Sequence, residues 1–140
     1  MPSIHLFTDK ISYQFRDHES LISWIKLIVE GESKRLGDIN LIITSDEELL
    51  KINKIFLHRD YLTDTISFPS SVGDRISGEA YLSLDRIVDN ATILGVDEEE
   101  ELHRVIVHSV LHLIGYGDSS DSEKLIMRAK EDFYLNLRPV

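Results

Sequence analysis

Two histidines and an aspartate in the last third of the chain are spaced as metal ligands. His108 and His112 lie four residues apart in the apolar run 105–114. Four residues of α-helix rise about 6 Å and return to the same face, so two imidazoles at this spacing can share one ion. Gly115 can end that helix and turn the chain back, which would bring Asp118 toward the same face. Two imidazoles, one carboxylate and an open fourth position form the layout of zinc hydrolases, so the sequence predicts a zinc site here.

The residues around the two histidines leave an alternative to a metal. Because the helix is apolar on nearly all sides, both imidazoles are expected to be enclosed, and enclosed polar groups need partners. Either a metal ion or a hydrogen-bond network could satisfy them. Ser109 stands where the His-Glu-x-x-His signature of metalloproteases carries its general base. Serine has no carboxylate to take a proton from water, so a metal-dependent peptidase of that mechanism is disfavoured.

Composition limits the kind of protein that positions this segment. The chain has 140 residues, of which 42% are hydrophobic and 29% charged, which is typical of one globular domain, here residues 1–140. It has no cysteine, so disulfides, thiolate metal sites and a cysteine nucleophile are excluded. The sequence has neither a signal-peptide pattern nor the roughly 18 apolar residues of a membrane span, so we expect a cytoplasmic protein without a membrane partner.

The charge of the chain argues against one way of binding nucleic acid. Twenty-five acidic and fifteen basic residues give a net charge of -10, so a broad basic surface is excluded. Any nucleic-acid role would therefore need another, local source of positive charge, such as a metal ion or a few side chains like Arg59, Arg75 or Arg86. If such a groove binds nucleic acid, we expect activity to fall steeply with salt.

Strands in the first part of the chain and helices mostly in the last part must hold the metal helix. Hydrophobic runs bounded by glycine, proline or polar turns predict short strands at 4–7, 11–15, 39–44, 63–68 and 80–84. Helical periodicity predicts amphipathic helices around 21–28, 45–56, 87–94, 97–114 and 123–135, the last packing over the metal helix. This order predicts an α+β fold, a single domain with a mixed β-sheet, helices packed on it, and a metal-binding helix that ends in a glycine turn.

Polar residues mark where the predicted helices begin. Asp17 or Ser20 can cap the first helix and Asp85 the third, while capping boxes are expected at Ser45 with Glu48 and at Asp97 with Glu100. We interpret the glutamates at 98–101 as the solvated start of the metal helix, where they oppose the helix dipole favourably.

The metal segment resembles a known family motif. Residues 108–118, His-Ser-Val-Leu-His-Leu-Ile-Gly-Tyr-Gly-Asp, are similar to the zinc-binding run His-Gly-x-Leu-His-Leu-x-Gly-Tyr-Asp-His of the YbeY family. Residues 62–69 resemble the family's Thr-Asp-Val-Leu-Ser-Phe-Pro strand, and residues 78–85 its Gly-Asp-Ile strand with the following helix cap. The resemblance covers nearly the whole chain, in order.

The resemblance implies a fold and an activity. The fold is a mixed sheet carrying helices, with the metal helix near a cleft. The activity is that of a zinc-dependent, single-strand-specific endoribonuclease, a hydrolase of RNA phosphodiester bonds in the bacterial cytoplasm. It implies roles in maturation of the 3′ end of 16S ribosomal RNA and in ribosome quality control. The partners would be single-stranded ribosomal RNA and ribosomal or ribosome-associated proteins. One zinc ion would be held by His108, His112 and Asp118, and no residue is assigned as the general base.

The chain departs from the family pattern at two positions. Asp118 stands in place of the third histidine, and its negative charge would leave a zinc-bound water less acidic than in a three-histidine site. Leu57 stands where the family commonly has an arginine. Arg59 could reach the same space, with a solvated loop charge as the alternative. Asp64 is a candidate general base, with a turn cap as the alternative.

Two other functions stay open. A zinc ion with three protein ligands can be structural as well as catalytic. The chain could therefore be a ribosome-assembly binding module whose metal holds the fold and which cleaves little. A metal-dependent peptidase ranks third because of Ser109.

Overall fold

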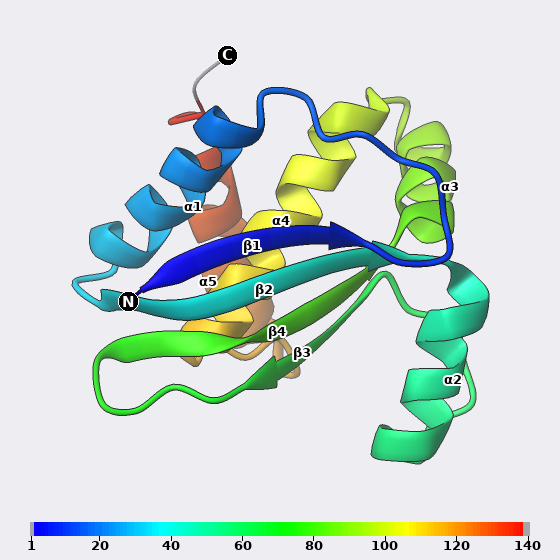
Figure 1. Ribbon diagram of the computed structural model, residues 1–140, viewed down its shortest axis with the longest axis horizontal. Helices are drawn as coiled ribbons and strands as arrows, with labels where there is room; N and C mark the ends of the chain where they lie inside the picture. The colour runs from blue at the N-terminus through cyan, green and yellow to red at the C-terminus, as the bar shows by residue number, and fades with distance from the viewer. Residues whose placement is uncertain (1, 139–140) are drawn as a thin grey trace.

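A computed structural model describes residues 2–138 as four strands and five helices (Figure 1). The strands are β1 (Ser3–Thr8), β2 (Arg35–Thr44), β3 (Thr65–Pro69) and β4 (Arg75–Ser83). The helices are α1 (His18–Gly31), α2 (Asp46–Leu57), α3 (Leu84–Leu94), α4 (Glu98–Ile114) and α5 (Asp121–Leu135). Met1 and residues 139–140 lie outside the description, so the domain ends at 1 and 140 stay a prediction. In the described part, no helix combines the length and hydrophobicity needed to cross a membrane.

The strands form one sheet in the order β1-β2-β4-β3. β1 pairs with β2 and β2 with β4 in parallel, whereas β3 and β4 form an antiparallel hairpin. The sheet is therefore mixed, which confirms the predicted α+β class. β4 begins at Arg75, five residues before the predicted strand, so the hairpin loop is shorter than the sequence indicated.

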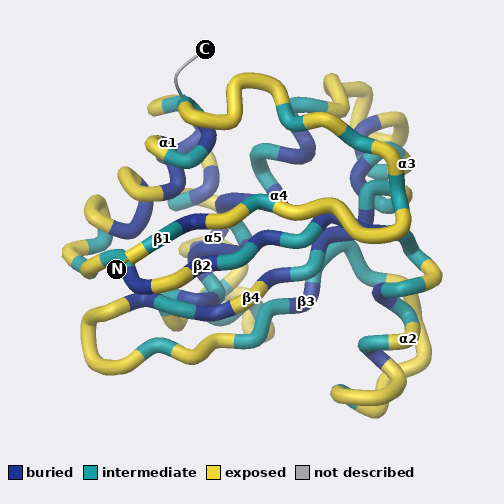
Figure 2. Tube along the Cα trace, in the orientation of Figure 1, coloured by how far each residue is buried: buried dark blue, intermediate teal, exposed yellow. Residues whose placement is uncertain are grey.

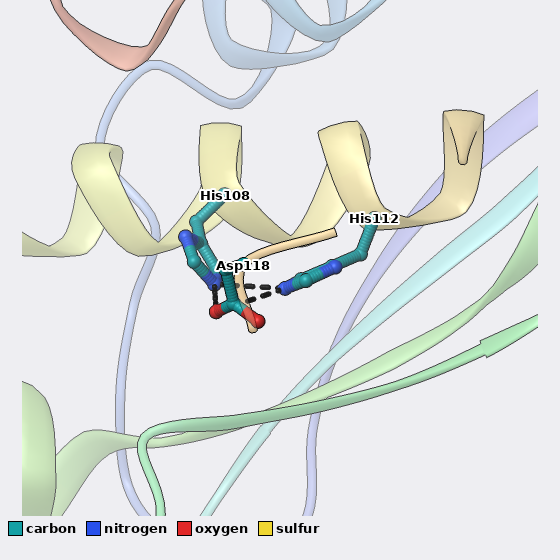
Figure 3. Close-up of side chains that lie close together, drawn as sticks. All are labelled: His108, His112 and Asp118. Carbon is teal, nitrogen blue, oxygen red and sulfur yellow. Dashed lines mark hydrogen bonds and ion pairs between the residues drawn. The ribbon is translucent and has the colours of Figure 1, made fainter. Parts of the chain in front are cut away.

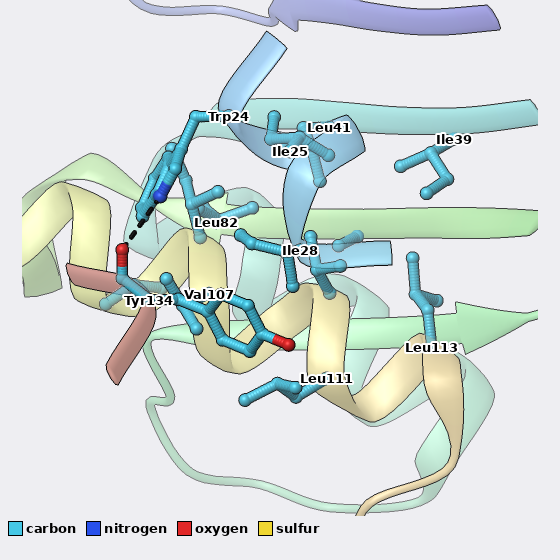
Figure 4. Close-up of a cluster of buried hydrophobic side chains, with 14 of the residues drawn as sticks. Trp24, Ile25, Ile28, Ile39, Leu41, Leu82, Val107, Leu111, Leu113 and Tyr134 are labelled. Atoms are coloured by element: carbon cyan, nitrogen blue, oxygen red, sulfur yellow. Dashed lines mark hydrogen bonds between the residues drawn. The ribbon is translucent and has the colours of Figure 1, made fainter. Parts of the chain in front are cut away.

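One face of the sheet carries α1, α4 and the core. Alternate residues of β2 are buried, α1 packs on β2 and α4 packs on β3 and β4, and burial is concentrated on the sheet and on the inner sides of these helices (Figure 2). The indole nitrogen of Trp24 on α1 donates a buried hydrogen bond of 2.9 Å to the carbonyl oxygen of Tyr134 on α5 (Figure 4). This bond ties α1 to α5, and Val107 and Leu111 of α4 lie in the same cluster.

A glycine on β4 lets α4 lie close to the sheet. Gly78 has a φ of 151°, and a Cβ atom there would lie 2.6 Å from the carbonyl oxygen of Phe68 and 2.7 Å from a methyl carbon of Leu113. No side chain fits at this contact. The last turn of α4, which carries the second histidine, therefore rests directly on β4.

The predicted strand at 11–15 is wrong. These residues are a loop between β1 and α1, in which Tyr13 and Phe15 meet edge to face at 5.3 Å. Their side chains are partly buried against the core. Alternating hydrophobic residues predicted a strand, but here the alternate side chains cover the core from a loop that pairs with no strand.

Two of the four predicted helix caps are found, and α5 begins with one that was not predicted. Asp17 accepts a bond from the Ser20 amide, and the Ser45 hydroxyl accepts one from the Glu48 amide at 3.2 Å. A complete capping box at Ser120 and Glu123 begins α5.

The cap of α3 is Ser83 and not Asp85. The Ser83 hydroxyl accepts a bond from the Arg86 amide at 3.1 Å. The Asp85 carboxylate, one residue into the helix, instead accepts from the amide of Asp46 at 2.9 Å and so joins α3 to the start of α2.

The start of α4 also differs from the prediction. Asp97 is the N-cap, but its side chain accepts no bond from the first turn. Glu101 was expected to be solvated, yet it is 6% exposed. Burial raises the pKa of Glu101, and the negative charge of Asp64 raises it further. The glutamate run is therefore a solvated start only in part, because the helix turns its fourth glutamate inward.

Candidate metal centre

The last turns of α4 and the segment after it bring the three predicted ligands together (Figure 3). The Nε2 atoms of His108 and His112 are 2.9 Å apart. One carboxylate oxygen of Asp118 lies 3.2 Å from Nε2 of His108 and 3.5 Å from Nε2 of His112. One donor atom from each residue lies within 4.8 Å of the other two, so the group could hold a single metal ion.

The outer nitrogens of both imidazoles have hydrogen-bond acceptors as partners. Nδ1 of His108 lies 2.7 Å from a carboxylate oxygen of Glu131, and Nδ1 of His112 lies 2.8 Å from the carbonyl oxygen of Tyr116. Each Nδ1 therefore carries the proton and donates it, which leaves the lone pair on Nε2. Two lone pairs 2.9 Å apart repel each other unless a cation or a proton lies between them. The donor set thus fits a metal ion, and zinc accepts these ligand types.

Glu131 on α5 is the residue that orients His108. It is 5% exposed and also accepts a hydrogen bond of 2.9 Å from Arg104. Burial by itself would raise the pKa of Glu131, but the bonds from His108 and Arg104 outweigh it and hold the pKa below its usual value. For His108 the opposing causes are burial, which lowers the pKa, and the bond and charge of Glu131, which together raise it overall.

Sequence reasoning missed Glu131 and assigned its helix only to packing. A signal was present, because Glu131 follows Met127 by four residues and so lies on the buried face of an amphipathic helix. A carboxylate at such a position requires a cationic or hydrogen-bonding partner inside the protein.

A second buried carboxylate fixes the glycine turn. Gly115 has a φ of 121°, and its amide bonds back to the carbonyl oxygens of Leu111 and His112. The next residue, Tyr116, donates its hydroxyl to Glu32, which also accepts from Tyr134 and Lys130. Burial would raise the pKa of Glu32, but these three partners lower it, so the carboxylate is ionised. Glu32 therefore holds the residue whose carbonyl oxygen orients His112.

A cavity of about 430 Å³ opens beside the three ligands. Its other walls come from α2, the loop after it, and β3. Besides the ligands, the lining residues are Asn53, Leu57, Arg59, Tyr61, Thr63, Asp64, Thr65, Ile66 and Ser67. The volume is within the range of roughly 300–1,000 Å³ found for small-molecule sites.

Hydroxyl groups from β3 and the preceding loop give this wall its polar character. The Ser67 hydroxyl oxygen is enclosed and has no hydrogen-bond partner within residues 2–138. The Thr65 hydroxyl donates to Ser109 at 2.8 Å, because Ser109 donates its own proton to the Val105 carbonyl oxygen. Ser109 is thus buried and fully bonded, so it offers no base to the site.

Only one of the three predicted basic residues lines this cavity. Arg59 is exposed and lies in the same wall as Leu57, so it does reach the space near that position. Arg86 is engaged with Asp46 at 3.0 Å and with Asp89 at 2.9 Å. Arg75 begins β4 and is not part of the lining. The expected basic groove is therefore a single guanidinium.

Asp64 is the second carboxylate of the lining, after Asp118. Its backbone carbonyl accepts a bond from the Ser83 amide at 2.9 Å, and its side chain makes no hydrogen bond with the described residues. The turn-cap interpretation therefore finds no support in its contacts. His103 is not part of the lining, and its ring meets Trp24 edge to face at 5.4 Å.

Comparison with known proteins identifies one family over residues 4–138. Residues 4–138 match the family model described as Endoribonuclease YbeY. A protein of that name from Flavobacterium psychrophilum is 45% identical over 131 residues, which are 94% of each chain. Another from Cytophaga hutchinsonii is 42% identical over 137 residues, covering 97% of this chain and 96% of the relative.

A solved structure shares the fold. The solution structure of TM1509 from Thermotoga maritima matches with a TM-score of 0.66 and 26% sequence identity. The match covers 96% of this chain and 87% of the other. The mixed sheet and its helices are therefore an arrangement that has been observed experimentally.

Proposed function

Because this chain belongs to the YbeY endoribonuclease family, we propose that it hydrolyses single-stranded RNA at a zinc site formed by His108, His112 and Asp118. The observation that carries the proposal is the pair of Nε2 atoms facing one another at 2.9 Å, each freed by an acceptor at its Nδ1. When bound, zinc supplies a Lewis acid that stabilises negative charge on a phosphate oxygen.

Residues around the ligands would bind the RNA and transfer protons. Asp118 offsets part of the zinc charge, and its place beside both imidazoles supports its role as third ligand. Arg59 binds a phosphate of the RNA from the opposite wall. Asp64 takes the proton of the attacking water, since its side chain is the other carboxylate of the cavity.

Family membership supports the biological setting. The substrate would be ribosomal RNA, with maturation of the 3′ end of 16S rRNA and ribosome quality control as the process. Ribosomal or ribosome-associated proteins would be the partners, and the bacterial cytoplasm would be the location.

The test is metal content together with cleavage of single-stranded RNA. The native chain is compared with His112→Ala and Asp118→Ala, and with His5→Ala as control, because His5 is an exposed histidine on β1. We expect the first two variants to lose both metal and cleavage, and the control to keep both. Metal retained in both ligand variants would show that His112 and Asp118 are not ligands. A native chain that holds zinc but does not cleave RNA would instead favour the ribosome-assembly binding module.

A further inference from the structure

Tyr61 is an exposed aromatic residue in the wall of the metal cavity. It is 54% exposed and lines the cavity that contains the three candidate ligands. In the described part of the chain, the other aromatic residues of comparable exposure each rest on another ring: Phe7 on His5, Phe56 on Phe68, and Phe133 on Tyr134. The Tyr61 ring has no such contact within residues 2–138, and its hydroxyl has no hydrogen bond there. Its exposure therefore has no explanation in the packing of the protein.

The backbone that carries this ring is fixed. Asn53 on α2 is 1% exposed, and its side-chain amide donates to the carbonyl oxygen of Tyr61 at 2.9 Å. The carbonyl oxygen of the same asparagine accepts from the Arg59 amide at 3.1 Å, and Lys54 pairs with Asp60 at 3.4 Å. A ring on a backbone held at these points needs little further ordering to contact a ligand, so contact with it costs little conformational entropy.

The charged groups of the cavity provide little affinity for RNA, and an aromatic ring can add to it. Its lining offers one cation, Arg59, and two carboxylates, Asp64 and Asp118. In a chain of net charge -10, so few phosphate contacts give weak binding of RNA. Stacking of bases on aromatic rings is the other main source of affinity for single strands, and it does not depend on positive charge.

We propose that Tyr61 is the stacking platform for an RNA base beside the phosphate that is cleaved. The inference rests on the proposed endoribonuclease function and adds a base subsite to it. Arg59 and the metal ligands would hold the backbone of the strand, while Tyr61 would hold the face of one unpaired base. Every base has such a face, so the subsite favours unpaired nucleotides with little preference for sequence.

The test measures binding and cleavage of a short single-stranded RNA by the zinc-loaded protein. Tyr61→Ala removes the ring, Tyr61→Phe keeps it without the hydroxyl, and Phe133→Ala removes an exposed ring on α5 as the matched control. We expect Tyr61→Ala to raise Kd and KM by about 5- to 150-fold, the range for loss of one stacked base, with a smaller change in kcat. Tyr61→Phe should restore binding, and zinc content should be native in all variants.

A set of RNAs with one abasic nucleotide at successive positions separates stacking from a structural role. The native protein should lose affinity when the abasic nucleotide occupies one position next to the cleaved bond. Tyr61→Ala should be insensitive to the same change, because the contact is already lost. Native affinity in Tyr61→Ala, or equal abasic penalties in both proteins, would overturn the inference. If the native protein binds the RNA without cleaving it, the proposed function fails, while the affinity comparison still decides the role of Tyr61.

Discussion

Replacing Glu131 by glutamine tests how the site orients its first histidine. The carboxylate uses one oxygen for Nδ1 of His108 at 2.7 Å and the other for Arg104 at 2.9 Å. Glutamine has the same shape but only one oxygen. If that oxygen faces His108, the amide NH₂ meets the guanidinium, donor against donor. If it faces Arg104, the amide donates to Nδ1, and the proton of His108 moves to Nε2, where it blocks the metal.

Both outcomes weaken metal binding, and the expected size follows from the contact that is lost. Substitution of a residue that orients a metal ligand typically costs 10- to 100-fold in metal affinity, about 1.4–2.7 kcal/mol. Arg104 keeps its second partner, Asp132, at 2.8 Å, so the metal-free protein should lose only about 1–3 kcal/mol of stability and still fold.

The assay is a competition titration in which Glu131→Gln and a coloured chelator compete for zinc, with thermal unfolding of the metal-free protein beside it. Asp132→Asn is the matched control. Asp132 is 55% exposed in its side chain and shares Arg104 with Glu131, but its carboxylate bonds to Arg104 and not to His108. The control should keep native zinc affinity and lose less than about 1 kcal/mol of stability. Native zinc affinity in Glu131→Gln, or an equal loss in both variants, would refute the orienting role.

Three further predictions concern stability and salt. Burial, followed by the charge of Arg138, lowers the pKa of His103 from 6.5 to about 4. As pH falls from 6.5 to 4, the unfolded chain therefore binds a proton at His103 that the folded chain does not bind. Over that window the free energy of unfolding of the native protein should drop by about 3 kcal/mol more than that of His103→Asn, measured by urea unfolding at both pH values. Equal drops in the two proteins would contradict a buried neutral imidazole. Glu32→Ala should lower the free energy of unfolding by about 2–3 kcal/mol and weaken zinc binding, whereas the exposed Glu30→Ala should change stability by less than about 0.5 kcal/mol. With Arg59 and the metal as the two phosphate contacts, RNA affinity should fall only about 7-fold for a fourfold rise in salt, and not the roughly 300-fold of a six-contact basic groove.

The grouping of the three candidate ligands could be predicted because they lie close together in the sequence. Helical spacing places His108 and His112 on one face, and a glycine turn returns Asp118 within six residues of the second histidine. Such local geometry depends on backbone rules that hold in any fold. The strands near 4–7, 39–44 and 63–68 were predicted for the same reason, because their hydrophobic patterns are local.

The residues that support the ligands could not be predicted in this way. Glu131 is 23 residues from His108, and Glu32 is 84 residues from Tyr116. Their contacts exist only because α5 packs on α4 and because the end of α1 meets the glycine turn. The sequence shows at most that a carboxylate lies on a buried face. It does not show which partner on another helix that carboxylate meets.

The acidity of the chain explains why the cavity should prefer unpaired RNA. Most of its basic side chains are in ion pairs with acidic neighbours, and of the basic side chains Arg59 lines the cavity. A duplex offers mainly phosphates to a protein surface, and its base faces are already stacked on one another. A site with one guanidinium and one free ring gains little from such a ligand, whereas an unpaired base can stack on Tyr61. Loss of the ring should therefore weaken binding of single strands more than binding of duplexes, and this difference is measurable with the same variant.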